Sequence, residues 1–129
     1  MDMLDSVKRD LVIANRILAA EGVMDAYGHV SMRHPMHQNR FLLARSCSPA
    51  LVTEDDIMEF ALDGEPIGGD DRHPYIERFI HGAFYEARPE VSAVAHSHAV
   101  EVLPYTVTAT PLRPAIHSAG VIGGDGMAP

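Results

Sequence analysis

Residues 77–100, ERFIHGAFYEARPEVSAVAHSHAV, decide most of what the sequence predicts about the fold. A helical pattern passes through an Arg-Pro pair into an apolar run at 91–100. The helix is expected over about 74–87, with Pro74 in its first turn, because proline suits that position. The apolar content of the run predicts a central strand buried on both faces.

Two histidines in this run are the strongest candidates for chemistry. His96 and His98 are two residues apart, and along a strand such residues point to the same face, with Cβ atoms about 7 Å apart. Two imidazoles so placed can ligate one divalent ion. They could equally be hydrogen-bonded core histidines, or histidines that face solvent at a strand edge.

A carboxylate and an imidazole precede the strand by one short connection. Glu77 and His81 are four residues apart and share a helix face. If that face folds over the histidines, Glu77 becomes a metal ligand or a general base beside the ion. The alternative is a solvated helical pair. The core face of the helix is expected to be apolar: Ile76, Phe79, Ile80, Ala83, Phe84 and Ala87.

The chain before this segment predicts one long helix and several short strands. A helix is expected over 3–20, with Gly22 as its left-handed cap. Strands are expected at 30–33, 41–44 and 59–62. Because little helix separates them, we predict an α/β fold of three layers with a mainly antiparallel central sheet, not a doubly wound parallel one. The helical stripe is Leu4, Val7, Leu11, Ala14 and Leu18.

Two further sequence patterns describe connections. Thr53 followed by Asp56 is an acidic variant of the capping box, which predicts one or two helical turns. After position 100, the prolines at 104, 111 and 114 predict short extended pieces, with strand candidates at 106–116 and 121–122.

Composition narrows the class of protein. The length of 129 residues fits one domain, 1–129. Ten Lys and Arg against eighteen Asp and Glu give a net charge of −8, so we expect no nucleic-acid partner. No apolar run approaches the roughly 20 residues of a membrane span, so we expect no membrane. The single cysteine, Cys47, excludes an internal disulfide and suits the cytoplasm.

Two other polar clusters are candidates for substrate binding. The turn Gly28-His29-Val30-Ser31 offers backbone N–H groups, an imidazole and a hydroxyl, which suits an anion; it could also be a plain turn into a strand. Arg45, near two serines, could bind a carboxylate or be a surface charge. The remaining histidines His34, His37 and His73 are expected in solvent.

Taken in order, these pieces resemble the class II aldolase/adducin family, over the N-terminal part of its domain. The matching pieces are the first helix, GHVS at 28–31, TEDD…LDG at 53–64, ERFIHGAFYEARPE at 77–90 and AVAHSHAV at 93–100. The family implies carbon–carbon lyases, such as aldolases and decarboxylases. It also implies homo-oligomers, often tetramers.

The resemblance assigns roles to individual residues. His96 and His98 match two of the family's metal histidines, so a divalent ion (zinc, manganese or iron) is expected there. Glu77 matches its acid–base glutamate. Substrate-binding roles are expected for Gly28, His29, Ser31, Arg45 and His117. The family's third metal histidine lies beyond the end of this chain, so the domain is expected to be incomplete at its C-terminus.

Three departures shape the expected substrate. His29 stands where the sugar-phosphate aldolases have asparagine, and Tyr75-Ile76 stand where they have phosphate-binding serines. Ser118 follows His117 where the epimerases have a catalytic aspartate. The stretches RSCSPALVTEDD and PAIHSAGVIGGDG are more similar to the branch that decarboxylates aromatic and heteroaromatic acids.

The function expected is therefore a metal-dependent lyase that cleaves a C–C bond through an enolate-like intermediate. The preferred substrate is a small hydroxy-aromatic or heteroaromatic carboxylic acid, which undergoes decarboxylation. A sugar-phosphate aldolase of the same family is one alternative. A non-catalytic adducin-like interaction module is another, and a non-haem iron oxygenase is a third, since two histidines and a carboxylate can form an open iron site.

Overall fold

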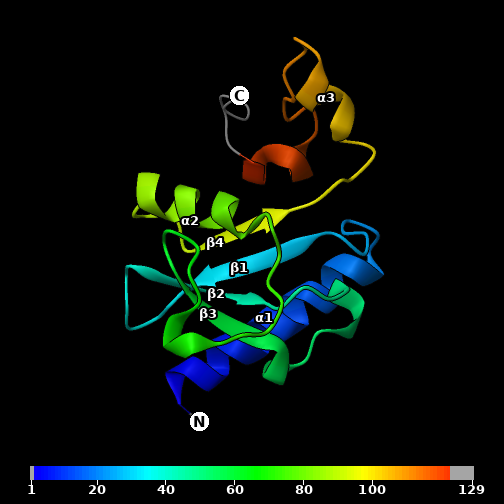
Figure 1. Cartoon of the computed structure of the whole chain (residues 1–129). Coiled ribbons are helices and arrows are strands. Elements are labelled where there is room, and N and C mark those ends of the chain that lie inside the picture. The colour runs from blue at the N-terminus through cyan, green and yellow to red at the C-terminus, as the bar shows by residue number, and fades with distance from the viewer. Residues whose placement is uncertain (1, 123–129) are drawn as a thin grey trace. The chain divides into compact units, whose positions relative to one another are not determined.

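The computed structural model describes residues 2–122, and the chain divides into two compact units, Met1–Ser97 and His98–Pro129 (Figure 1). The first unit carries the sheet and the two longer helices. Its elements in chain order are α1 (Met3–Ala20), β1 (His29–Arg33), β2 (Arg40–Ala44), η1 (Pro49–Leu51), η2 (Glu54–Asp56), β3 (Ile57–Ala61), η3 (Ile67–Gly69), α2 (Arg78–Ala87) and β4 (Ala93–His96).

Four strands form one antiparallel sheet in the order β3-β2-β1-β4. Ser31 of β1 pairs with Leu43 of β2 on one side and with Val94 of β4 on the other. The three strands expected upstream are confirmed, although β3 begins two residues earlier than expected. The predicted α/β fold with a mainly antiparallel central sheet is therefore confirmed.

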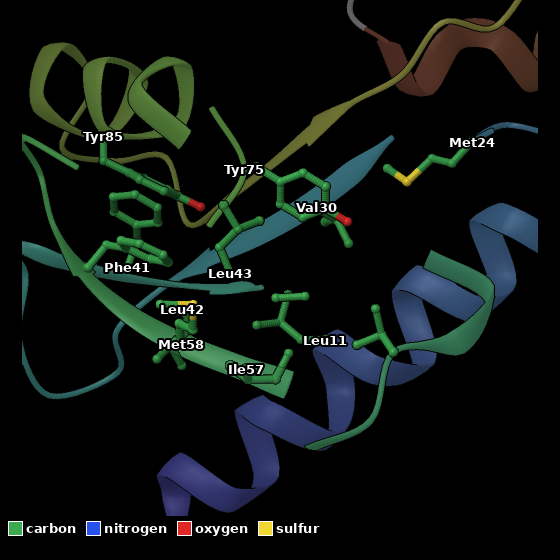
Figure 2. Close-up of a cluster of buried hydrophobic side chains, with 13 residues drawn as sticks. Leu11, Met24, Val30, Phe41, Leu42, Leu43, Ile57, Met58, Tyr75 and Tyr85 are labelled. Atoms are coloured by element: carbon green, nitrogen blue, oxygen red, sulfur yellow. The ribbon is translucent and has the colours of Figure 1, made fainter. Parts of the chain in front are cut away.

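The helix α1 covers one face of this sheet (Figure 1). Its expected stripe is confirmed, since Leu11 is fully buried and Leu4, Val7, Ala14 and Leu18 pack against the same core. Figure 2 shows Leu11 among the buried side chains between α1 and the sheet. The helix ends at Ala20, Glu21 is its C-cap, and Gly22 has the expected left-handed backbone, with a φ of 72°.

The helix α2 covers the opposite face, which completes three layers within the first unit (Figure 1). Two predictions about it were wrong. It begins at Arg78 instead of 74, because the backbone at Pro74 forms an isolated bridge with Arg45. Its buried residues are His81, Gly82 and Tyr85, whereas the residues expected in the core are exposed, including Ile76 just before it (79%), Phe79 (48%) and Phe84 (51%).

Strand alternation explains why polar helical residues are buried. Side chains of β1 alternate between faces, so Val30 and Met32 lie on the side of α1 while His29, Ser31 and Arg33 lie on the side of α2. Buried polar groups need hydrogen-bond partners, which an apolar helix face cannot provide. The helix therefore turns its polar side to the sheet.

The apolar run at 91–100 also differs from its prediction. Only Ala93–His96 form a strand, and among the described residues β4 pairs with β1 alone, at the edge of the sheet. None of its four residues is fully buried. The prediction of a central strand buried on both faces was wrong, because a high apolar content does not determine how many neighbours a strand has.

Between β2 and β3 the expected capping box is confirmed. The backbone N–H and the hydroxyl of Thr53 both donate to the Asp56 carboxylate, at 2.9 and 2.8 Å.

In the second unit, Leu103–Val107 form the helix α3 and His117–Ile122 form η4. The strand candidates predicted at 106–116 and 121–122 were therefore wrong: 106–107 belong to α3, no strand is found at 108–116, and 121–122 belong to η4. Within residues 2–122, no helix is both long enough and apolar enough to span a membrane.

Candidate functional site

Two imidazoles meet across the β1–β4 pair. The register places His29 directly opposite His96, although 66 residues separate them in the chain. Opposite residues on one face of a sheet lie close enough for their side chains to touch. The two rings stack with centroids 4.9 Å apart and an angle of 14° between their planes.

Glu77 brings a carboxylate to both rings. It is the residue immediately before α2, and that helix lies over the same face of the sheet as His29. Its Oε2 atom lies 3.1 Å from His29 Nε2 and 3.3 Å from His96 Nε2. The Glu77 side chain is 44% exposed, whereas that of His29 is fully buried. The carboxylate thus lies between a buried imidazole and a more accessible one.

Behind His29, a chain of hydrogen bonds leads into the protein. His29 Nδ1 lies 2.7 Å from His81 Nε2, and His81 Nδ1 lies 2.6 Å from Ser31 Oγ. Ser31 Oγ in turn lies 2.7 Å from the hydroxyl of Tyr85. His81 and Tyr85 are four residues apart, on the buried face of α2. All four of these residues are buried, and the chain connects them to Glu77.

Burial sets the charge state of this chain. Loss of solvent, together with the neighbouring His29 and His96, lowers the pKa of His81 to about 3. Burial also raises the pKa of Tyr85 to about 12. Near neutral pH, His81 is therefore a neutral imidazole with one ring proton, and Tyr85 keeps its hydroxyl proton.

Arg33, also on this face of β1, holds the last turn of α2. Its guanidinium donates to the carbonyls of Tyr85 and Arg88 at the end of that helix, and to those of Gln38 and Val91. It also lies over the Tyr85 ring, 4.7 Å from the centroid. The carbonyls at a helix C-terminus lack partners in the helix, so a cation there stabilises it.

An aromatic ring covers His29 beside the carboxylate. The centroid of the Tyr75 ring lies 4.5 Å from that of His29. Its hydroxyl donates to the backbone carbonyl of Cys47, and burial raises the pKa of Tyr75 to about 12. With the hydroxyl bound to the backbone, the ring is the part of Tyr75 that faces His29.

Gly28 allows β4 to approach this site. A Cβ atom at Gly28 would lie 2.8 Å from Met24 Cβ and 3.2 Å from the carbonyl oxygen of His96. A side chain there would therefore press against Met24 and the backbone of His96. The N–H of Gly28 donates to the carbonyl of Asp25 at 3.2 Å, within the turn before β1.

Three further residues were predicted to belong to the site, and of these only Arg45 lies in the first unit. Arg45 is 44% exposed and pairs with Asp56, whose Oδ1 is 2.6 Å from Arg45 Nε. His98 is half-buried and lies beyond the end of β4, in the second unit, so strand alternation does not apply to it. His117 is exposed and begins η4. Within the first unit, the structure brings together Gly28, His29, Ser31, Glu77 and His96.

One histidine expected in solvent is buried. His34 is only 3% exposed, its ring lies 4.7 Å from that of His37, and its Nδ1 accepts the N–H of Met36 at 3.1 Å. Burial lowers its pKa. The sequence could not show this, because the polar segment around His34 folds back on β2, where the N–H of His34 donates to the carbonyl of Arg40. His37 and His73 are exposed as expected.

Glu77 and two histidines beside it could contribute to a metal centre. His29, Glu77 and His96 each offer one ligand atom, and these atoms lie within 4.8 Å of one another. Two imidazole nitrogens and a carboxylate oxygen form a donor set that suits zinc, manganese or iron. The donor chemistry therefore fits a divalent transition metal.

Sequence reasoning missed the buried chain of His81, Ser31 and Tyr85 as part of the site. It placed His81 beside Glu77 on a helix face but not in the core. One signal was available: Gly82 follows His81 inside the helix, and a glycine inside a helix often marks close packing. That signal marks the face of α2 that touches the sheet.

Comparison with known proteins agrees with this arrangement. Residues 9–128 match the family model described as "Class II Aldolase and Adducin N-terminal domain". Decarboxylase tropJ of Talaromyces stipitatus is 42% identical over 117 residues, covering 89% of this chain and 44% of that protein. Methylthioribulose-1-phosphate dehydratase of Gluconacetobacter diazotrophicus is 34% identical over 94 residues, covering 71% of this chain and 44% of that protein.

Solved structures show the same fold. L-fuculose 1-phosphate aldolase from Glaciozyma antarctica superposes with a TM-score of 0.81 at 29% identity, covering 92% of this chain and 50% of that one. An aldolase II superfamily protein from Pseudomonas syringae gives a TM-score of 0.80 at 23% identity, covering 95% and 50%. The chain spans about half the length of the relatives it matches. It belongs to the class II aldolase/adducin family, whose N-terminal domain it matches over nearly its whole length.

Proposed function

We propose that this chain provides the acid–base residue and metal-binding residues of a lyase that cleaves a carbon–carbon bond. The observation that carries the proposal is the position of Glu77, whose Oε2 is 3.1 Å from His29 Nε2 and 3.3 Å from His96 Nε2. A half-exposed carboxylate between two imidazoles suits proton transfer to a substrate and metal binding.

In this proposal His96 and His98 hold a divalent ion, with Glu77 close to it. When bound, the ion supplies Lewis-acid stabilisation of the enolate-like charge left by C–C cleavage. Glu77 takes up a proton from solvent and delivers it to the substrate carbon from which carbon dioxide has left. His29 holds Glu77 in place, and Gly28, Ser31, Arg45 and His117 complete the set of residues proposed to bind or orient the substrate.

Decarboxylation of a hydroxy-aromatic or heteroaromatic acid is the proposed reaction. Two observations support it: the 42% identity to a protein named a decarboxylase, and the Tyr75 ring beside His29, 4.5 Å between centroids. A flat apolar wall suits an aromatic acid better than a sugar phosphate. The second candidate is a sugar-phosphate aldolase, favoured by the 29% identity to L-fuculose 1-phosphate aldolase.

The experiment compares both reactions in the purified protein with added zinc, manganese or iron. Release of carbon dioxide from a panel of hydroxy-aromatic and pyridine carboxylic acids is measured beside cleavage of fuculose 1-phosphate. Glu77→Gln is expected to lower kcat by about 10²–10⁴-fold, the usual range for losing an acid–base group. Glu86→Gln, an exposed glutamate on α2, is the matched control.

Three results would overturn parts of this proposal. Unchanged kcat in Glu77→Gln removes the acid–base role. Cleavage of the sugar phosphate with no decarboxylation selects the second candidate. Bound metal that persists after His96→Ala and His98→Ala together removes the proposed ligands.

An assembly of identical subunits is also proposed. It is supported by the apolar side chains that α2 leaves exposed, Phe79 and Phe84 among them. Light scattering of the purified protein measures the mass in solution, and a monomer at all concentrations would contradict the proposal.

A further inference from the structure

We propose that Tyr85, Ser31, His81 and His29 form a one-way hydrogen-bonded chain that ends on Glu77, in which His81 is a positioning residue that fixes the ring proton of His29 on Nε2. The four contacts of this chain are 2.7, 2.6, 2.7 and 3.1 Å long. The importance of the chain for catalysis rests on the role proposed above for Glu77. The proton positions do not depend on that role.

The direction of the chain follows from counting protons at each contact. An ionised carboxylate can only accept, so His29 Nε2 must carry the proton that it donates to Glu77 Oε2. In the proposed chain His29 is a neutral imidazole with one ring proton, so its Nδ1 is left as an acceptor. His81 Nε2, 2.7 Å away, must then be the donor.

The same count continues into the core. With its single proton on Nε2, His81 has an acceptor at Nδ1, so the hydroxyl of Ser31 donates to it at 2.6 Å. The oxygen of Ser31 then accepts from the Tyr85 hydroxyl at 2.7 Å. Every contact uses one proton and no group needs a charge, apart from Glu77. The strongly lowered pKa of His81 agrees with a neutral ring.

The consequence for the site is that His29 acts as a donor to Glu77. A metal ligand must offer a lone pair, and a protonated Nε2 offers none. If His29 ligated a metal through Nε2, its proton would move to Nδ1, and His81, Ser31 and Tyr85 would all reverse their hydrogen bonds. The chain thus opposes metal binding by His29 and holds the carboxylate beside His96.

The test reads the ring protons directly, without substrate or metal. Long-range ¹H–¹⁵N spectra of the protein labelled with ¹⁵N-histidine, recorded with a chelator near neutral pH, distinguish protonated from unprotonated ring nitrogens. The loss of one signal set in His29→Gln identifies His29. In the unmodified protein, His29 is expected to be protonated at Nε2 and unprotonated at Nδ1.

Two variants of His81 form a matched pair. His81→Gln keeps an N–H donor at about the position of Nε2, so His29 is expected to keep its form. His81→Asn is one bond shorter and reaches toward Ser31 but not His29, so His29 is expected to become a mixture of both neutral forms. Amide spectra of each variant check that the fold is retained.

Two further variants test the direction and remain informative if His81 variants do not fold. Ser31→Ala removes the donor to His81 Nδ1, so the His29 signals are expected to change. Tyr85→Phe removes only the group that donates to Ser31, so they are expected to stay. A wild-type His29 that is protonated at Nδ1, or at both nitrogens, overturns the proposal. A change in the His29 signals of Tyr85→Phe as large as the change in Ser31→Ala also overturns the proposal.

Discussion

Replacing Gly82 with alanine is expected to destabilise the protein, although the same change inside most helices stabilises it. Gly82 is a buried residue in the middle of α2. A Cβ atom there would lie 2.0 Å from the carbonyl oxygen of Leu62 and 3.0 Å from its carbonyl carbon. Real Cβ contacts are essentially never shorter than 3.0 Å, so α2 and the backbone of Leu62 must move apart by at least 3.0 − 2.0 = 1.0 Å.

The two opposing terms give the size of the effect. Alanine in a helix interior is favoured over glycine by about 1 kcal/mol. Overpacking a well-packed site costs about 1–3 kcal/mol, and the upper part of that range applies because the contact is with backbone and cannot swing away. The net loss in the free energy of unfolding is therefore about 1–2 kcal/mol.

The site would move with the helix. A retreat of about 1 Å along the bond from His81 Nδ1 to Ser31 Oγ would stretch it from 2.6 Å beyond the range of a hydrogen bond. Gly82→Ala is therefore expected to loosen the hydrogen-bonded chain behind Glu77 as well as the fold. This links the stability measurement to the spectra of His29 described above.

Urea denaturation followed by circular dichroism measures this prediction. With a slope of about 1–3 kcal/mol per molar urea, the midpoint is expected to fall by roughly 1 M in Gly82→Ala. The control is Ala83→Gly, the next residue along α2, which is exposed and should lose about 1 kcal/mol from helix propensity alone. A midpoint for Gly82→Ala at or above that of the unmodified protein would refute the close contact with Leu62.

Three further changes have defined outcomes. Burial lowers the pKa of His81 to about 3 in the folded protein, so as the pH falls the unfolded chain binds a proton at this histidine before the folded chain does. The free energy of unfolding therefore declines by up to about 1.4 kcal/mol per pH unit from about pH 6.5 toward 3. The difference between the urea midpoints at pH 7.5 and pH 5.5, measured with a chelator present, should be smaller in His81→Gln than in the unmodified protein. An equal difference in the two proteins contradicts this. Arg33→Lys should lower the free energy of unfolding by about 2–3 kcal/mol, because lysine cannot satisfy the four carbonyls that Arg33 contacts; a loss below 1 kcal/mol in the same assay argues against it. Thr53→Ala should cost about 1 kcal/mol through loss of the capping box, and an unchanged midpoint would show that the box does not contribute.

The sequence predicted elements well where the pattern and the packing partner agreed. The stripe of α1 meets an apolar sheet face through Leu11, so periodicity alone found both the helix and its buried side. Periodicity failed for α2. It located the helix to within a few residues but chose the wrong face, because the sheet there presents His29, Ser31 and Arg33. Which face packs depends on the chemistry of the partner, and a single helix does not carry that information.

The site depended on information of another kind. Spacing drew attention to His96 and His98, and the structure brings His29 and His96 together at Glu77. That pair arises from the register between β1 and β4, which short-range spacing does not encode. Spacing and the family resemblance both drew attention to Glu77, the carboxylate that lies beside His29 and His96. Sequence patterns thus identified most of the residues, and strand pairing decided which of them meet.

His29 and Tyr75, two of the residues that differ from the sugar-phosphate aldolases in the sequence comparison, lie side by side in the structure. Their position bears on the proposed substrate. His29 and Tyr75 are 46 positions apart in the sequence, yet their ring centroids are 4.5 Å apart, directly beside Glu77. Asparagine is shorter than histidine and could not bond to His81 on one side and to Glu77 on the other, as the two ring nitrogens of His29 do. Tyrosine turns its ring, not its hydroxyl, toward that histidine. Two substitutions that look independent therefore act on one place, where they replace small polar groups by rings. If the substrate meets this place, as proposed above, the rings suit a flat acid better than a phosphate ester, which supports the proposed decarboxylation over aldol cleavage.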